Sequence, residues 1–404
     1  MSHPNNDGAE MVRRLVVSRS VAQRSGVPLE SVGPAEVDGV GPDAGAVVDR
    51  VAAALERAEH TGLPEAAGDR AAFWQAREIV LHETRQVCAK LDEDPDAPLD
   101  DDDLLALEAI IRIDGSRPCL PIRGGSFDPV HPFAGVWSST LAAVQPRLYH
   151  HIAAVGRIEP EGATADTYFG TGWVVDSARG LVLTNWHVVD GMCRSKPPRV
   201  VVDHHRHRVV GNVFVDFVCE SASTATNRFQ VVDIRVPGPA GSASRRLDAA
   251  VLIVEPATPT SRMPTAIPLR ADLDGPRGLH RSLCAVGFPG WSQLTSGRGR
   301  KVNWKAVYAG TFGDAMGVKH LSPGRVHTPI PASHACGRAG AFGHDLTTMH
   351  GSSGSPIIAW LQAVPTAFGL HFGGENTGDM ASSNYAHAFS EAADAFRALG
   401  VLVE

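Results

Sequence analysis

The first third of the chain carries hydrophobic residues at helical spacing. Between residues 43 and 111, apolar side chains recur every three or four positions, and prolines or acidic stretches interrupt them. The three runs are Val47–Ala58, Ala72–Leu91 and Leu104–Ile111. Because this spacing places the apolar residues on one helix face, the sequence predicts about three helices in a small bundle.

From about residue 150 the pattern changes to short apolar runs separated by turn residues. The runs that we expect to be strands are Thr171–Val175, Leu181–Thr184, Val209–Val215, Ala249–Val254, Leu283–Gly287, Lys305–Gly310, Ile357–Trp360 and Ala367–Leu370. Many short strands over about 250 residues are typical of an all-β barrel or sandwich. The run Ser390–Leu399 has Ala393, Phe396 and Leu399 on one helical face, which predicts a C-terminal helix.

These changes of pattern divide the chain into four parts. Residues 1–42 are polar and rich in Gly, Pro and Ser, which is typical of a mobile arm, with a short helix near Met11–Val21. Residues 43–111 form the helical module, 112–149 are a connector rich in Pro and Gly, and 150–404 are the β-rich domain.

Composition and charge narrow the classes of protein. The 404 residues are 43% hydrophobic and 20% charged, so the chain can bury a full core and is not a disordered protein. Residues 1–115 carry 23 acidic and 11 basic side chains, whereas the remainder carries 21 and 26. The acidic part either attracts a cationic partner or screens the basic part within the chain. Neither part of the chain has the strongly basic net charge that is typical of nucleic-acid-binding proteins.

The lack of targeting signals and the arrangement of the cysteines indicate the cellular compartment of the protein. The chain has no run of about 18 apolar residues and no signal-peptide pattern at its start. Its six cysteines are scattered without a C-x-x-C pair, which is typical of reduced thiols. We therefore expect a cytoplasmic protein without a membrane span.

Three local patterns carry candidate chemistry. The first is Thr-Asn-Trp-His-Val-Val at 184–189, the second is Asp248 at the opening of an apolar strand, and the third is Gly-Ser-Ser-Gly-Ser-Pro at 351–356. Singly, each has a structural explanation as a strand-end histidine, a turn aspartate or a loop. Taken together, in the order His187, Asp248, Ser353, the three patterns are a far more specific signal than any one of them alone.

With that order and those two motifs, residues 150–400 resemble the trypsin-like serine endopeptidases of the chymotrypsin superfamily. The resemblance implies two six-stranded antiparallel β-barrels, so the fold class is mostly β with an N-terminal helical region and a C-terminal helix. The family has a cysteine soon after the histidine in its animal digestive members. Here Val188 to Met192 intervene before Cys193, which favours a bacterial type.

The resemblance also implies a mechanism. A serine hydroxyl is a weak nucleophile at neutral pH and needs a base within hydrogen-bonding reach. His187 would take the Ser353 proton, and Asp248 would orient the imidazole. The amides of Gly351 and Ser353 would form the oxyanion hole. No metal or cofactor is required, and the partners are a protein or peptide substrate and, for the helical module, a regulatory or adaptor partner.

The primary specificity pocket is a further expectation from the resemblance. Thr347 stands where trypsin has an acidic residue, so a preference for Arg or Lys is not supported. Thr348 and His371 match a threonine and a histidine of staphylococcal-type glutamyl endopeptidases, and Gly373 lies in the matching strand. A hydroxyl and an imidazole together can bind a carboxylate. The alternative is a buried structural histidine and a pocket for small or apolar side chains.

Other interpretations stay open at this point. A trypsin-like barrel that has lost activity can act as a binding module, although the intact motifs argue against it. An α/β-hydrolase using Ser353 with His371 or His387 lacks the expected βαβ alternation. The Asp100–Asp103 run is better explained as a helix N-terminus than as a metal site. The histidines of 203–208 are expected to form a polar hairpin tip.

Overall fold

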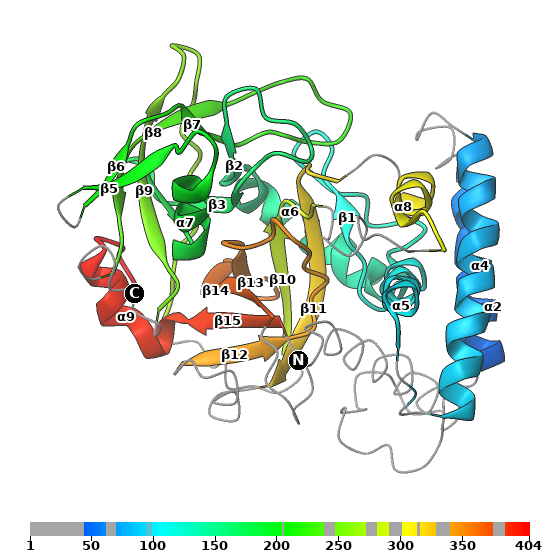
Figure 1. Ribbon diagram of the computed structural model, residues 1–404. Helices are drawn as coiled ribbons and strands as arrows, with labels where there is room; N and C mark the ends of the chain where they lie inside the picture. The colour runs from blue at the N-terminus through cyan, green and yellow to red at the C-terminus, as the bar shows by residue number, and fades with distance from the viewer. Residues whose placement is uncertain are drawn as a thin grey trace.

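The computed structural model describes residues 44–61, 70–94, 97, 99–203, 206–237, 247–271, 281–290, 301–312, 316–328, 340–374 and 384–404. Two β-barrels lie side by side, and a group of helices packs at one side of them (Figure 1). The expected arm at 1–42, with its short helix, lies outside the described residues. No helix within the described ranges is long and apolar enough to span a bilayer.

The first barrel is closed by six antiparallel strands in the order β2-β3-β4-β9-β8-β7. They are β2 Val155–Pro160, β3 Gly170–Asp176, β4 Leu181–Thr184, β7 Val213–Asp216, β8 Arg228–Arg235 and β9 Ala250–Pro256. β4 is buried at every position, which explains its continuous apolar run. The hairpin of β5 Val200–Asp203 and β6 Arg206–Val209 lies beside this barrel.

The second barrel is formed by six further strands. They are β10 Ser282–Gly287, β11 His320–Thr328, β12 Ala341–His344, β13 Pro356–Ala359, β14 Thr366–Gly374 and β15 Asn384–Ala388. The pairing of β11 with β12 closes the ring, and the short β1, Leu120–Pro121, adds to β11. The two six-stranded antiparallel barrels confirm the fold class expected from the sequence.

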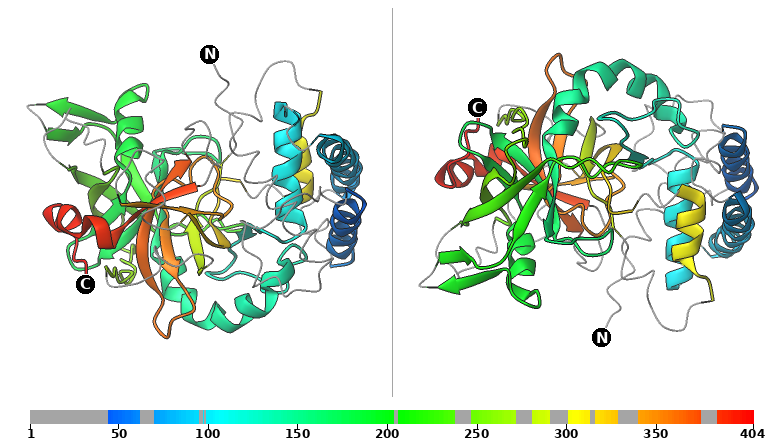
Figure 2. Two further views of the ribbon diagram at one scale, coloured as in Figure 1. Left: turned by 90° about the horizontal axis from the view of Figure 1, so that it is seen from below. Right: turned by 90° about the horizontal axis from the view of Figure 1, so that it is seen from above.

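The helical module is built from segments far apart in the sequence. It contains α2 Ala44–His60, α4 Arg70–Glu93 and α5 Asp101–Ile113, as the apolar periodicity predicted. α8, Trp304–Phe312, lies in the chain between β10 and β11 but packs with these three helices (Figure 2). Trp304, Val307 and Tyr308 share one buried core with the module.

The start of α5 confirms the capping explanation of the acidic run. Asp100 adopts an extended conformation, and its carboxylate accepts hydrogen bonds from the amides of Asp102 and Asp103. The Asp103 carboxylate in turn accepts from the Asp100 amide, which completes a capping box. These acids therefore satisfy the free amides at a helix start.

Two expectations about strands were wrong. Lys305–Gly310 lies in α8 rather than in a strand, because the neighbouring Trp304, Val307, Tyr308 and Thr311 are buried at helical spacing. The run Val209–Val215 is broken, since β6 ends at Val209 and β7 begins at Val213.

The segment taken as a connector contains structure of its own. It includes a 3-10 turn at Gly135–Trp137 and most of α6, Ser138–Ala153, which packs on the barrels through Leu141, Val144 and Leu148. The C-terminal helix α9, Phe389–Ala398, occurs where it was predicted and buries Phe389 and Phe396. Together α6 and α9 cover parts of the barrel surface (Figure 1).

Candidate active site

His187 lies on the first turn of a helix that follows a buried strand. β4 ends at Thr184, and α7, Trp186–Arg194, begins two residues later. Asn185 between them is fully buried, and its Nδ2 donates a 2.8 Å hydrogen bond to the carbonyl of Asp248. This bond ties the start of α7 to the segment before β9.

His187 and Asp248 form a pair through two hydrogen bonds. His187 Nδ1 lies 2.6 Å from Asp248 Oδ2, and the His187 amide donates to Asp248 Oδ1 over 2.9 Å. The pairing of Thr184 with Ala250 in the β4–β9 ladder brings the two chain segments together. A carboxylate that accepts the Nδ1 proton leaves Nε2 as the basic nitrogen. The imidazole stays 39% exposed, so this nitrogen is accessible to a substrate.

His387 on β15 supports Asp248 from behind. Its Nε2 accepts a 3.0 Å hydrogen bond from the Asp248 amide, and its side chain is buried. Sequence reasoning considered His387 only as a partner in an α/β-hydrolase. The structure instead shows it joining the second barrel to the Asp248 segment of the first.

Ser353 lies at the junction of the barrels, in the loop before β13. Its carbonyl accepts a 2.9 Å hydrogen bond from the Thr171 amide of β3. A Cβ at Gly170 would lie 2.8 Å from Val188 Cγ2 and 3.1 Å from the Ser353 carbonyl, so the start of β3 contacts both the His187 helix and the Ser353 loop. In the described residues no hydrogen bond joins His187 Nε2 to Ser353 Oγ; such bonds are often long before substrate binds.

Two bound carbonyls set the direction of the amides in the loop around Ser353. The His350 carbonyl accepts from the Gly290 amide over 2.6 Å, and the Ser352 carbonyl accepts from the Ser355 hydroxyl over 2.6 Å. In a trans peptide the N–H points away from the carbonyl, so the amides of Gly351 and Ser353 point away from these contacts. Among the described residues neither amide has a hydrogen-bond acceptor.

Glycine is required at both bends of this loop. Gly351 has φ +91° and Gly354 has φ +92°, which is backbone that side chains rarely adopt. A Cβ at Gly351 would also lie 2.2 Å from the Tyr168 hydroxyl, and one at Gly354 would lie 2.1 Å from the Thr171 carbonyl. The turn can therefore form only with glycine at these two positions.

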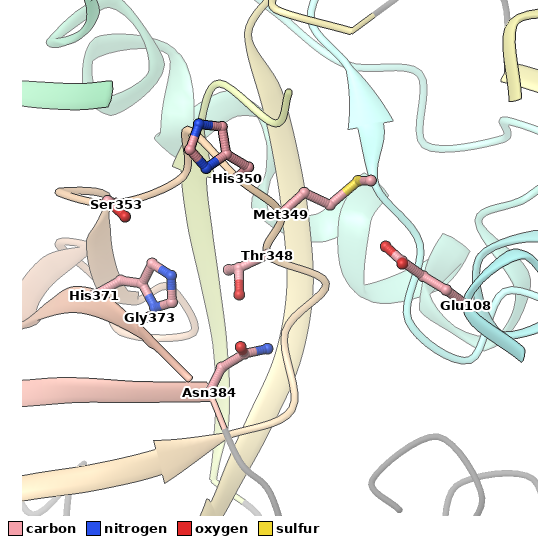
Figure 3. Close-up of a pocket in the computed structure, with 8 residues that line it drawn as sticks. All are labelled: Glu108, Thr348, Met349, His350, Ser353, His371, Gly373 and Asn384. Carbon is pink, nitrogen blue, oxygen red and sulfur yellow. The ribbon is translucent and has the colours of Figure 1, made fainter. Parts of the chain in front are cut away.

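A pocket of about 270 Å³ opens beside Ser353. Thr348, His371 and Gly373 line it, and so do Asn384 and Glu108 (Figure 3). The Thr348 hydroxyl is buried and has no hydrogen-bond partner among the described residues.

His371 of the pocket wall lies against a second buried imidazole, that of His344. His371 Nδ1 lies 3.1 Å from His344 Nε2. Burial, with a smaller contribution from the charge of His187, lowers the pKa of His371 to about 3. The His371 imidazole is therefore neutral at physiological pH when the pocket is empty.

Thr347 does not line this pocket. Its hydroxyl donates a 2.6 Å hydrogen bond to the carbonyl of Arg117, and Arg117 also forms an ion pair with Asp345. These contacts attach the pocket segment to the chain that follows α5. No three His, Cys, Asp or Glu side chains within the described ranges gather as a metal site would require.

Two pocket residues escaped the sequence analysis. Asn384 lies on β15 and Glu108 on α5, and no local motif marks either residue. Periodicity places Glu108 on a helix, but only the folded chain brings that helix to the pocket.

Comparison with known proteins identifies the family. The model of the trypsin-like peptidase domain matches residues 170–362. A probable serine protease of Lysobacter enzymogenes is 38% identical over 336 residues, which cover 82% of this chain and 84% of that protein. The chain belongs to the trypsin-like serine peptidases. It is a hydrolase of peptide bonds.

The similarity of this trypsin-like peptidase to its relative extends beyond the barrels. Because the match leaves less than a fifth of the chain uncovered, it must include α5 at residues 101–113. The sequence similarity of the two proteins thus extends into the helical region that contacts the pocket.

Proposed function

We propose that the protein is a serine endopeptidase that cleaves peptide bonds through an acyl-enzyme on Ser353. The observation that carries the proposal is that the start of β3 contacts both the helix of the His187–Asp248 pair and the Ser353 loop, whose Gly351 and Ser353 amides have no acceptor among the described residues. A Ser–His–Asp constellation of this kind needs no metal or cofactor.

Each residue has a defined part in this mechanism. His187 Nε2 takes the proton of Ser353 as its oxygen attacks the carbonyl carbon, and Asp248 stabilises the imidazolium. The Gly351 and Ser353 amides bind the oxyanion, a contribution of about 3–4 kcal/mol per donor. His187 then protonates the leaving amine, and water hydrolyses the ester by the same proton transfers.

We also propose that the pocket accepts an acidic side chain before the cleaved bond. The unpartnered Thr348 hydroxyl and the His371 imidazole support this, because both can hydrogen-bond a carboxylate. A bound carboxylate would also offset the burial that keeps His371 neutral. Thr347 has no part in this proposal, since its hydroxyl is bound to Arg117.

We propose, thirdly, that the helical module restrains or targets the peptidase domain. Its support is the core that the module shares with α8 and with Met349 of the pocket segment. A partner of the module would act through this contact.

We further propose a cytoplasmic, bacterial-type enzyme. This proposal is supported by the absence of disulfides among the five described cysteines.

Cleavage of a peptide library by the purified protein tests the activity and the pocket together. We expect cleavage after acidic residues and loss of at least about 10³-fold in kcat with Ser353→Ala. A fluorophosphonate probe should label the wild type and leave Ser353→Ala unlabelled. If neither protein reacts or cleaves, the chain is an inactive peptide-binding module; cleavage only after Arg or Lys would refute the acidic pocket.

A further inference from the structure

Helix α5 of the helical module presents a carboxylate to the specificity pocket. Glu108 lines the pocket together with Thr348, His371 and Asn384 of the second barrel, and it faces them from the far side of Met349 (Figure 3). It is the only acidic side chain among the described lining residues. The pocket is thus completed by a residue more than 200 positions from the Ser353 loop.

Packing around the next turn of α5 fixes the position of Glu108. Arg112 is 2% exposed, its guanidinium carbon lies 3.8 Å from the centre of the Phe312 ring, and its Nη1 lies 3.7 Å from Met349 Sδ. The Tyr308 hydroxyl donates a 3.0 Å hydrogen bond to the Leu105 carbonyl. Because α5 is held on both sides, the backbone of Glu108 keeps its position beside the pocket.

No described residue forms an ion pair with the Glu108 carboxylate. Burial raises the pKa of Glu108, while the positive charge of Arg112 opposes that shift. The carboxyl group of Glu108 faces the pocket. In its ionised form it would repel a second carboxylate entering the same space, whereas an amide of equal size would not be repelled.

We propose that Glu108 is a specificity-determining residue, contributed by the helical module, that lowers the preference of the pocket for carboxylate side chains over their amides. This inference rests on the proposed peptidase function and deepens it. Thr348 and His371 provide binding for polar oxygen atoms, and Glu108 limits how much of that binding an anionic side chain obtains. The module thereby restrains the enzyme through charge at the specificity pocket.

The test compares two fluorogenic peptides that differ only in Glu or Gln before the cleaved bond. The full-length protein and Glu108→Gln, which removes the charge and keeps the shape, are assayed at pH 8. We expect the ratio of kcat/KM for the Glu peptide over the Gln peptide to rise roughly fivefold in Glu108→Gln. The rise should shrink at 0.5 M salt because salt screens charge.

The control is Glu78→Gln on α4, whose side chain is 68% exposed and outside the pocket. It should leave the ratio unchanged, and Glu108→Ala replaces Glu108→Gln if that variant fails to fold. A ratio that is unchanged in Glu108→Gln, or no cleavage of either peptide by any variant, overturns the inference. In both cases cleavage of other peptides that Ser353→Ala abolishes would leave the peptidase function standing.

Discussion

At the scale of single residues, Thr171 joins the two barrels behind the Ser353 loop. It is fully buried, its amide binds the Ser353 carbonyl, and its hydroxyl donates to the Gly351 carbonyl over 2.8 Å. The same hydroxyl accepts from the Phe288 amide, and the Thr171 carbonyl accepts from Thr184. Thr171 touches no reacting atom, so it acts by holding the turn in place.

This arrangement predicts a loss of turnover when the hydroxyl is removed. Thr171→Val keeps the shape but leaves the Phe288 amide and the Gly351 carbonyl unsatisfied. We expect kcat to fall roughly tenfold with little change in KM, and Thr171→Ser to restore most of it. Steady-state kinetics measure both, with the exposed Thr260→Val as the control. Equal losses in the Val and Ser variants would contradict a role for the hydroxyl.

At the scale of elements, the contact between α5 and α8 links the helical module to the pocket. Trp304 of α8 is 1% exposed, and its Nε1 donates a 2.9 Å hydrogen bond to Asp102 near the start of α5. The Trp304 and Tyr308 rings also pack edge to face at 5.9 Å between centres. These contacts hold α5 against α8, and they thereby hold Glu108 beside the pocket.

Loosening this contact should affect stability and activity together. Trp304→Phe removes the indole donor and keeps an aromatic ring, so we expect the free energy of unfolding to fall by about 1–2 kcal/mol. If the module restrains the enzyme, kcat/KM for an acidic peptide should rise. Denaturant unfolding and kinetics measure the two effects.

Lys90→Gln is the matched control for that variant. This variant removes a partly exposed ion pair between Lys90 of α4 and Asp103 of α5. Such a pair contributes about 0.2–1 kcal/mol to the free energy of unfolding. An equal or greater loss of stability from Lys90→Gln would show that the Trp304 contact does not hold α5.

At the scale of the whole molecule, buried histidines make the fold sensitive to acid. Burial lowers the pKa of His320 on β11 and of His371 on β14 to about 3. The unfolded chain protonates its histidines near the ordinary pKa of about 6.5. The stability that these groups contribute is therefore complete above that pH and is lost progressively as the pH falls toward 3.

The wild type should lose more stability on acidification than a variant without one of these histidines. Each contributes a loss of about 2 kcal/mol in the free energy of unfolding between pH 7 and pH 5. His320→Gln should reduce the pH dependence by that amount, as measured by urea unfolding at the two values. An identical pH dependence in both proteins would contradict neutral burial of His320.

Much of the fold and of the candidate site followed from local patterns. Apolar periodicity predicted α2, α4 and α5, and the Asp100 cap was readable because capping needs only neighbouring residues. α8 was predicted as a strand because the helix is only nine residues long and rich in β-branched and aromatic side chains. Thr347 was expected at the pocket by its place in the chain, but its hydroxyl turns toward Arg117.

The sequence alone indicated the class of chemistry, because the order of His187, Asp248 and Ser353 and the motifs around the histidine and the serine resemble those of trypsin-like serine endopeptidases. It also determined the β-rich architecture through alternation and turn residues. Only the tertiary structure decided that α8 would join the helical module and that Glu108 would reach the pocket. Such contacts depend on how separate surfaces pack, and the spacing of residues along the chain carries no record of that packing.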